Sequence, residues 1–584
     1  MSQNETKRNV LVCLIVNIVL AALLIRAENW NFNDGYTHEV IYGAAIAVLV
    51  VALPLWYPHA GFLQKIYGAL KDKAVKAVMF LNENYRTILI DCAVYIVSAL
   101  AGYLISKAIC KTTWNEIIGL GFISGGLILA SLWVFRASLK DKPEKLFAAL
   151  ALIAGCFFIR AAPTEVGICW DDNFHYDGTI ALLTVNGTCY ASDAEIIDHV
   201  ALTAFDKEGY SKQDREERDA LIDSLYAEGQ TMPYYHRNFG TNTIAYIPYS
   251  VGLYLARGLG LPYTVCFRME KLFNLLFYIA VFCYAIKRLK FGKILAACIG
   301  LVPTNLFMTT SFSYDPWIIC LTVLGYAYFF GALQERDQKL TNKEIAVMLG
   351  AFTLACIPKA LYVALMLPLL FMPKDKFASD KQRRVYYIAG FAIVILLCAS
   401  VLMPMIVSGA GEGDIRGGDN VNSAEQLHFI ASEPGKFIHI LSSFILEDYI
   451  NPLVSPQYSV NYAYLGFGRY LYIVPVILLL VGILDRNGTP GRTWQVTVST
   501  MIAAVLTIIL IPMALYISYT DVAAETVYGC QHRYLMPVIF PALYVNGFDR
   551  LKNRIDAAVF NSVPMVIFAL LFVSDLAGLL SELY

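Results

Sequence analysis

The residues best suited to chemistry lie together in the stretch 169–175, where an apolar run ends and a long polar segment begins. Asp171 or Asp172 could act as a general base that removes a proton from a hydroxyl group, with His175 orienting or assisting the carboxylate. The spacing suits this role, because residues three or four apart lie on one face of a helix. In the alternative, one aspartate caps the helix that we expect to begin near Asn173, while its neighbour faces a cavity.

Two cations further along the chain could bind a phosphate group. Lys359 follows Pro358 between two short apolar segments. The ammonium of Lys359 could bind the phosphate of a lipid-linked molecule. In the alternative, Lys359 extends its charge to the membrane surface and has no functional role. The helix break at Pro358 favours the functional interpretation. Arg533 could contact phosphate through its planar fork or anchor a helix end at the interface. Gln531 and His532 precede it and are expected to support the site.

Asp315 offers a second carboxylate and is followed by Pro316. Because proline favours the first turn of a helix, we predict that Asp315 caps a helix, with a dual role as the alternative. The 13 cysteines are scattered, mostly in apolar runs, so we interpret them as small packing residues. Their spacing does not indicate a zinc site. A divalent metal could join the carboxylates, although no motif indicates one, and no cofactor is expected.

The composition is that of a polytopic membrane protein. The 584 residues are 58% hydrophobic and only 16% charged, and the mean hydropathy is +0.55, which excludes a soluble globular chain. Apolar runs of about 20 residues, enough to cross a bilayer as a helix, recur along most of the chain. The runs are continuous and rich in Leu, Ile and Ala, so they predict an all-α helical bundle and not a β-barrel.

The distribution of basic residues orients the predicted helices. Lys7 and Arg8 precede the first apolar run, so the N-terminus should be cytoplasmic. Alternating the later spans places every basic loop inside and leaves two long outer loops at 163–240 and 408–468. The segment 246–259 then cannot be a full crossing and is predicted to be a re-entrant or interfacial helix. All the candidate site residues then face the outer side. The prediction comprises about 15 transmembrane helices, near residues 10–25, 39–57, 88–109, 115–136, 147–162, 268–286, 294–310, 315–333, 345–357, 360–373, 386–407, 470–484, 494–516, 534–547 and 557–578.

Several of these segments together resemble an uncharacterised bacterial family of polytopic membrane proteins, whose fold is similar to that of the GT-C glycosyltransferases. The first family motif, Asp-Glu-x-x-His in the first large outer loop, corresponds to 171–175, where Asp172 replaces the usual glutamate. The resemblance covers roughly residues 145–580. It implies a GT-C-like module in residues 143–584, preceded by about four additional transmembrane helices in residues 1–142. The other matching segments are Tyr246 to Gly258, Arg268 to Asn274, Lys287-Arg288, Leu301 to Asp315, Pro358-Lys359 and Gly529 to Pro537.

The resemblance implies an integral glycosyltransferase of the bacterial cell membrane, which transfers a sugar from a polyprenyl-phosphate donor to a cell-surface glycan, lipid or polymer. Asp171 or Asp172 is then the general base, and we favour Asp171. Lys359 and Arg533 bind the donor phosphate. Membrane lipids are expected partners, and nucleic acids are not. The alternatives are a transporter or flippase of lipid-linked glycan precursors and a non-catalytic membrane scaffold.

Overall fold

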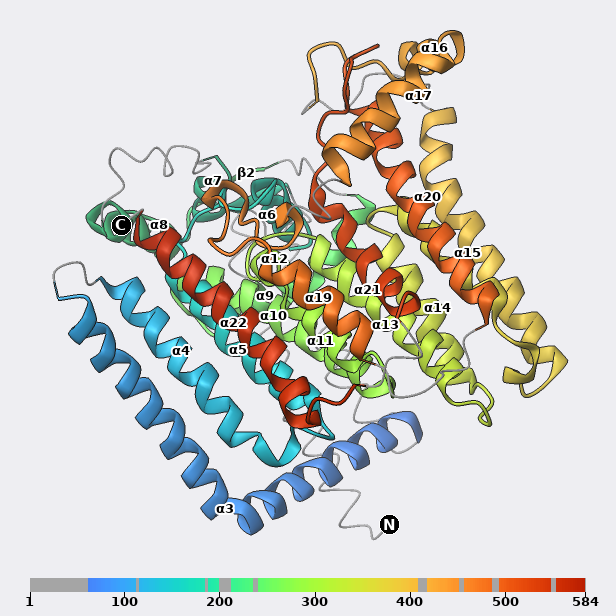
Figure 1. The fold of residues 1–584 in the computed structure, drawn as a ribbon. Coiled ribbons are helices and arrows are strands. Elements are labelled where there is room, and N and C mark those ends of the chain that lie inside the picture. Colours follow the sequence, from blue (N-terminus) through green and yellow to red (C-terminus); the bar gives the residue numbers. More distant parts are fainter. Residues whose placement is uncertain are drawn as a thin grey trace.

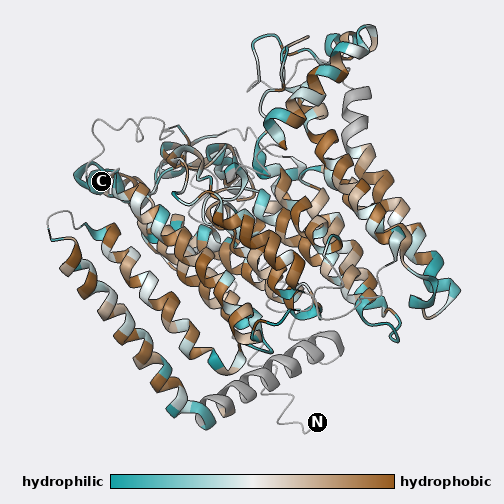
Figure 2. Ribbon diagram, viewed as in Figure 1, coloured by the Kyte–Doolittle hydropathy of each residue, from teal (hydrophilic) through white to brown (hydrophobic). Residues whose placement is uncertain are grey.

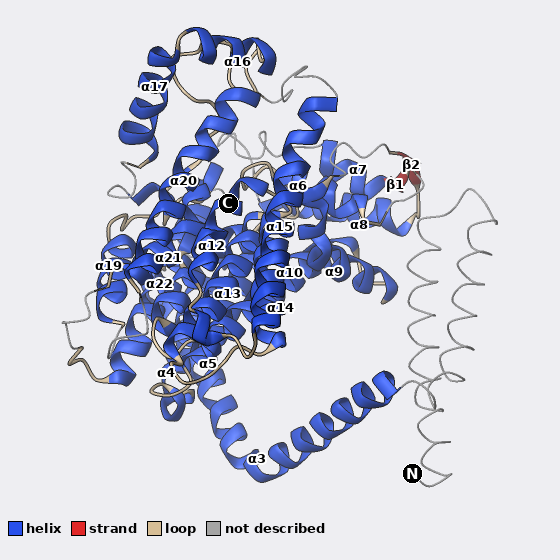
Figure 3. Cartoon of the chain, turned by 90° about the vertical axis from the view of Figure 1, so that its right-hand side faces the viewer, coloured by secondary structure: helices blue, strands red, loops and turns tan. Residues whose placement is uncertain are grey.

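The computed structural model describes residues 61–111, 115–183, 187–198, 212–234, 240–407, 417–450, 456–485, 493–547 and 553–582. Within these ranges the chain is almost entirely helical (Figure 3). Two short strands, β1 (Thr188–Tyr190) and β2 (Thr231–Pro233), pair antiparallel in the first long loop. The predicted helical membrane fold is confirmed for these residues.

Seven helices of the described residues are long and apolar enough to cross a membrane. Each coincides with a predicted span, and Figure 2 shows the hydrophobic residues along their lengths. The predicted total of about 15 is not confirmed, and the first two predicted spans lie outside the described residues. The seven helices are α3 (Gly61–Ile109, apolar over Glu83–Ile109), α4 (Glu116–Val134), α10 (Tyr263–Arg288), α13 (Asp315–Gln334), α15 (Asp380–Val407), α20 (Trp494–Ser518) and α22 (Ala557–Ser581).

The other predicted spans form shorter or divided helices. One is divided into α11 (Lys293–Leu301) and α12 (Pro303–Thr309), because proline lacks the backbone N–H that would continue the first helix. The predicted re-entrant segment forms α9 (Ile247–Gly258), whose length of about 18 Å is too short to cross a bilayer. One exception is α5 (Pro143–Ala161), which has 19 residues, as many as α4, but is not among the seven helices above. The remaining short helices are α14 (Asn342–Cys356), the 3-10 helices η3 (Ala360–Phe371) and η8 (His532–Leu535), α19 (Ile473–Leu484) and α21 (Met536–Val545).

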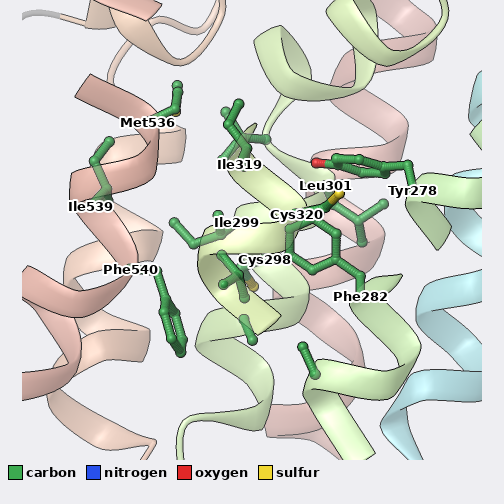
Figure 4. Packing of buried hydrophobic residues seen from close by; sticks show 14 of the residues in the cluster. Tyr278, Phe282, Cys298, Ile299, Leu301, Ile319, Cys320, Met536, Ile539 and Phe540 are labelled. Carbon is green, nitrogen blue, oxygen red and sulfur yellow. The ribbon is translucent and has the colours of Figure 1, made fainter. Parts of the chain in front are cut away.

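The apolar core lies where α5, α10, α11, α13, α21 and α22 pack together, and Figure 4 shows part of it. Phe282 of α10 packs against Phe147 of α5, with ring centroids 5.6 Å apart. Gly300 of α11 allows this approach, since a Cβ there would lie 2.7 Å from Phe147 and 3.0 Å from Phe282. Cys298 and Cys320 are buried in the same cluster, in the packing role predicted for cysteines of apolar runs.

The two long loops lie at one end of the bundle, which we call the loop end (Figure 1). The first loop carries α6 (Asp172–Ala181), α7 (Ala191–Asp198) and α8 (Lys212–Ala227). The other short elements of the chain are η1 (Arg136–Ser138), η2 (Thr241–Tyr246), η4 (Lys374–Lys376), α16 (Ser423–Ser432), α17 (Pro434–Ser443), the π-helical turn η5 (Phe444–Tyr449), η6 (Pro456–Tyr458) and η7 (Ala463–Leu465).

Basic loops meet at the opposite end of the bundle. Arg288, the last residue of α10, forms ion pairs with Glu335 and Glu344, each at 2.9 Å. Lys140, between α4 and α5, pairs with Asp556 at 3.2 Å, just before α22. These contacts bring together loops that the charge distribution assigns to one side of the membrane. That this side faces the cytoplasm stays a prediction.

A buried ion pair holds the first loop against the bundle. Arg257 of α9 and Asp193 of α7 are 1% and 0% exposed, and Nη2 lies 2.5 Å from Oδ1. The hydroxyls of Tyr176 and Tyr263 donate hydrogen bonds to the same carboxylate. The ring of Tyr190 lies 4.9 Å from the guanidinium carbon. Because Tyr176 belongs to α6, this buried cluster also positions that helix.

Removing the arginine of this pair should destabilise the loop end. In the Arg257→Leu variant the buried Asp193 carboxylate loses its cation, and breaking a buried pair costs about 3–5 kcal/mol. The partly exposed pair of Arg268 and Asp219, at 3.6 Å, provides a control, because Arg268→Leu should cost no more than about 1 kcal/mol. Thermal unfolding in detergent and limited proteolysis of the first loop measure both variants. Equal stability of the two variants would contradict the anchoring role of Arg257.

Candidate functional site

Asp171 lies immediately before α6 in an uncommon backbone conformation. Its φ of 54° and ψ of 21° belong to the left-handed region, which Asp and Asn adopt more readily than most residues. Asp171 occupies the N-cap position, but its side chain makes no capping hydrogen bond. The carboxylate is 35% exposed and lies 3.4 Å from Nη2 of Arg533. The capping interpretation is therefore wrong for Asp171.

Asp172 has a different task. It is 2% exposed, and its carboxylate accepts hydrogen bonds from the backbone N–H groups of Gly167, Ile168 and Cys169 at 2.5, 3.1 and 2.9 Å. Burial raises the pKa of Asp172 to about 6, although these backbone donors favour the charged form. The carboxylate thus fastens the turn before α6, and this turn presents Asp171.

The guanidinium of Arg533 joins two carboxylates. Its Nε lies 3.1 Å from Oδ2 of Asp315, in addition to the contact of Nη2 with Asp171. The side chain is 2% exposed, and its Cζ lies 4.8 Å from the ring centroid of Trp170. Burial lowers the pKa of Arg533, but the charge of Asp315 above all outweighs burial and raises the pKa beyond its usual value. The group is charged, and its Nη1 has no hydrogen-bond partner among the described residues.

Asp315 does not cap α13 as predicted. The helix begins at Asp315 itself, and Tyr314 occupies the N-cap position without a capping hydrogen bond from its side chain. The buried Asp315 carboxylate pairs with Arg533 instead. Pro316 does lie in the first turn. A proline there is compatible with a carboxylate at the N-cap or at the first helical position, so the pattern does not separate the two.

Lys359 reaches the same place from the junction of α14 and η3. Its Nζ lies 3.1 Å from the ring centroid of Tyr534, which holds the ammonium by a cation–π contact. Burial lowers the pKa of Lys359 to about 8, and the negative charges of Asp315 and Asp171 oppose that shift. Asp171, Asp315, Lys359 and Arg533 therefore form one group at the loop end, which we call the charged cluster.

Of the three other residues predicted for the site, His175 and His532 make contacts outside the charged cluster. Nδ1 of His175 lies 2.7 Å from the hydroxyl of Tyr246, and the His175 side chain is buried, so this contact supports α6. Nε2 of His532 lies 3.0 Å from the backbone carbonyl oxygen of Asp448. Gln531 has a buried Oε1 for which the described part of the chain provides no hydrogen-bond partner.

Sequence reasoning misses several neighbours of the cluster. Lys271 of α10 is 3% exposed, and its charge favours the ionised form of Asp172. Glu270 beside it is fully buried, and within the described ranges neither carboxylate oxygen has a hydrogen-bond partner. Charged residues inside an apolar span are the signal for such positions. Tyr464 of η7 is a further neighbour, since burial and then the charge of Asp171 raise its pKa; it belongs to an aromatic run in which the sequence does signal sugar stacking or an interfacial belt.

An apolar groove, which we call the η3 groove, lies along η3, the helix that follows Lys359. Its volume is about 320 Å³, and α14, η3, α15 and α20 supply its walls. The lining includes Val363 and Leu367 of η3, Phe391 of α15 and Leu506 of α20. Since η3 begins directly after Lys359, Val363, the first residue of η3 that lines the groove, follows Lys359 by four positions in the chain.

Comparison with known proteins places the chain in a family. The model of the DUF2142 family, described as predicted membrane proteins, matches residues 153–541, more than half of the chain. The chain belongs to this family. In this DUF2142 protein the matched range contains the whole charged cluster and both long loops. The searches of curated proteins and of solved structures find no match. Among the described residues of this DUF2142 protein, no three His, Cys, Asp or Glu side chains are grouped to hold a metal ion.

Loss of the Asp172 charge should open the turn before α6. The amide of Asp172→Asn cannot accept all three backbone hydrogen bonds, and an unmade buried hydrogen bond costs about 1–3 kcal/mol. The buried Cys169 thiol should then react with maleimide roughly tenfold faster than in the wild type, as measured by peptide-resolved mass spectrometry. Asp171→Asn is the matched control and should leave labelling unchanged, because the Asp171 side chain contacts Arg533. Unchanged labelling in Asp172→Asn would refute this role.

Proposed function

We propose that this protein is an integral membrane glycosyltransferase that uses a polyprenyl-phosphate-linked sugar at the outer face of the bacterial cytoplasmic membrane. Its N-terminus is cytoplasmic, and its acceptor is a cell-surface glycan, lipid or polymer. The observation that carries the proposal is the charged cluster. One partly exposed carboxylate, Asp171, lies 3.4 Å from the buried guanidinium of Arg533, with the ammonium of Lys359 close by. Transfer from a phosphate leaving group requires a base and cations of this kind.

In the proposed step, the acceptor hydroxyl attacks the anomeric carbon of the donor sugar. The Asp171 carboxylate takes the hydroxyl proton as the new carbon–oxygen bond forms. The bond between the anomeric carbon and the phosphate oxygen breaks, and polyprenyl phosphate leaves with the electron pair. Attack opposite to the leaving group inverts the configuration of the sugar. Nη1 of Arg533 and Nζ of Lys359 stabilise the charge that develops on the phosphate.

Asp171 and Asp172 differ in the exposure of their carboxylates, which a general base needs in order to reach its substrate. A base must reach the proton that it removes, and the side chain of Asp171 is 35% exposed, whereas Asp172 is 2% exposed with three backbone donors on its carboxylate. This contrast supports Asp171 as the base and Asp172 as a positioning residue. His175 is also a positioning residue, through its contact with Tyr246.

The η3 groove supports a lipid-linked donor. Its apolar lining on η3 begins four positions after Lys359 in the chain and continues along this helix. A polyprenyl chain in this groove would place its phosphate next to the cations of the charged cluster, and burial of each methylene contributes about 0.8 kcal/mol. A donor delivered from the membrane needs no nucleotide-binding domain, because its phosphate is held by side chains at the loop end.

One observation favours a second candidate function, a transporter or flippase of lipid-linked glycan precursors. That function predicts charges buried within membrane spans, and Glu270 and Lys271 of α10 are such charges. Neither residue is predicted from the sequence to be a buried charge. They also fit the enzyme, because Lys271 lies close to Asp172. The fate of the donor separates the two functions, since a flippase moves the lipid-linked sugar without cleaving it.

Replacing Asp171 with asparagine should abolish cleavage of the donor. Asparagine accepts the left-handed backbone of this position, so the variant removes the charge with little strain. Loss of a general base lowers the rate by about 10²–10⁴-fold. The purified protein in vesicles with radiolabelled polyprenyl-phosphate sugars, and with a membrane extract as acceptor source, provides the assay. The measured quantity is the release of polyprenyl phosphate.

The matched control is Asp419→Asn, which changes an exposed aspartate of the second loop and should retain full activity. Full activity of Asp171→Asn would eliminate Asp171 as the base. If no sugar of the panel is cleaved by the wild type, while the labelled lipid still moves between the two leaflets of the vesicle, the flippase is the better assignment.

The affinity for the donor should fall at alkaline pH, because Lys359 loses its positive charge there. Its pKa is lowered to about 8 by burial, so the ammonium loses its proton and its charge as the pH rises through that value. Lys359→Arg keeps a charged group far above this range and should remove the alkaline limb. Lys359→Gln should weaken donor binding below about pH 8, where the wild-type ammonium is charged, and should approach the wild type above that pH. The KM for the donor, measured between about pH 6 and 10, checks both variants. An unchanged alkaline limb in Lys359→Arg would assign the titration to another group.

A further inference from the structure

A second groove opens between α3, α4 and α22, and we call it the α4 groove. Its volume is about 860 Å³. Most of its lining is apolar or small, as with Ile105 of α3, Gly125 and Leu129 of α4 and Leu570 of α22. In Figure 1 these three helices form the left-hand edge of the molecule, away from α15 and α20, which line the η3 groove. The proposed transfer reaction does not use this groove.

The part of the α4 groove at the loop end carries polar groups. Arg469, Ser574 and Ser581 line the groove there. The guanidinium lies against α22, with Nη2 3.3 Å from the position that a Cβ would take on Gly578. Arg469 is exposed and forms no salt bridge with any residue that the structure describes. Its charge is therefore available to a ligand at the mouth of the groove.

The backbone of Arg469 is fixed by a buried carboxylate. Its N–H donates to Oδ1 of Asp575 at 3.2 Å, and the hydroxyl of Tyr462 donates to Oδ2 at 3.2 Å. Asp575 is 3% exposed on α22. Gly468 allows this approach, because a Cβ there would overlap the Asp575 carboxylate. Since both carboxylate oxygens already accept hydrogen bonds, Asp575 sets the position of Arg469 and leaves its guanidinium open.

We propose that the α4 groove binds an anionic phospholipid, with an acyl chain between the helices and the phosphate on Arg469. The groove extends along α22 from Ser581 to Ile567, a distance of about 21 Å along a helix, which accommodates most of an acyl chain. The apolar walls favour hydrocarbon over water. A guanidinium forms strong paired hydrogen bonds with phosphate, and the nearby Ser574 hydroxyl adds a polar contact for the headgroup.

The lipid site adjoins the charged cluster through one short hairpin. Asn461 and Phe467 pair as an isolated antiparallel bridge, and Tyr464 at the tip lies near Asp171. Arg469 follows two residues after the bridge. A lipid bound at Arg469 therefore contacts the segment that borders the charged cluster. The site itself does not depend on the transfer reaction, because the groove and its arginine are separate from the residues assigned to that reaction.

Native mass spectrometry of the full chain tests the proposal. The protein is delipidated in detergent and titrated with phosphatidylglycerol or with phosphatidylcholine of the same acyl chains. The wild type should retain phosphatidylglycerol more strongly. Arg469→Gln should weaken the retention of phosphatidylglycerol by about fivefold, as expected for one cation near a lipid phosphate, and Arg469→Lys should preserve most of it. Gly125→Leu should reduce both lipids, because it fills the groove from α4, where a Cβ meets only Leu570 at 3.8 Å.

The matched control is Arg136→Gln, which removes an exposed arginine that follows α4 at the end opposite the loop end and should change nothing. Equal retention of phosphatidylglycerol in the wild type and Arg469→Gln would overturn the headgroup assignment. Unchanged retention in Gly125→Leu would show that the lipid binds elsewhere or that another part of the chain fills the groove. Donor cleavage by Arg469→Gln, measured separately, distinguishes failure of this site from failure of the proposed enzyme.

Discussion

The guanidinium of Arg533 is the group around which the loop end is built. Arg533 belongs to η8, Asp315 begins α13, and Asp171 precedes α6, so three segments far apart in the chain meet at one planar cation. A buried guanidinium is costly without negative partners. The two carboxylates offset that cost, and the cation in turn permits a buried Asp315. Lys359 joins through Tyr534, the residue that follows Arg533.

The two carboxylates that contact Arg533 differ in role, and one nitrogen of the guanidinium contacts neither of them. Asp315 is buried and pairs with Nε, so it orients the guanidinium and maintains its charge. Asp171 contacts Nη2 at the longer distance of 3.4 Å and is partly exposed, which leaves its carboxylate accessible. Nη1 has no hydrogen-bond partner among the described residues. One side chain therefore combines a structural ion pair with an unused donor that can receive an anion.

The meeting of Asp171, Lys359 and Arg533 could be anticipated from the sequence, because the alternation of basic loops assigns all three to one side of the membrane. The choice between Asp171 and Asp172 could not be settled. It depends on a left-handed residue and on three backbone donors of the preceding turn, which no spacing rule encodes. Asp315 was assigned to a cap because proline in a first turn has the same pattern whether or not the carboxylate contacts a distant arginine.

The long helical spans were predictable for a simpler reason. Uninterrupted apolar runs such as the one in α20 leave little choice of structure in a membrane. The shorter elements were harder, since the break before Pro303 and the buried charges Glu270 and Lys271 reflect packing between helices. When hydropathy is averaged over a window of about 20 residues, one or two charged residues within an apolar run are not apparent. The predicted total of about 15 spans includes 294–310 as one crossing, a segment that the structure divides into α11 and α12.

The helix type of η3 (Ala360–Phe371) links the length of this segment to the position of the Lys359 charge. Twelve residues in a 3-10 helix rise about 24 Å, whereas the same residues in an α-helix rise about 18 Å. Lys359 is attached directly to the first turn of η3. Rewinding this segment as an α-helix would displace one end by about 6 Å relative to the other. The pitch of this helix and the depth of its terminal ammonium in the membrane therefore cannot change independently.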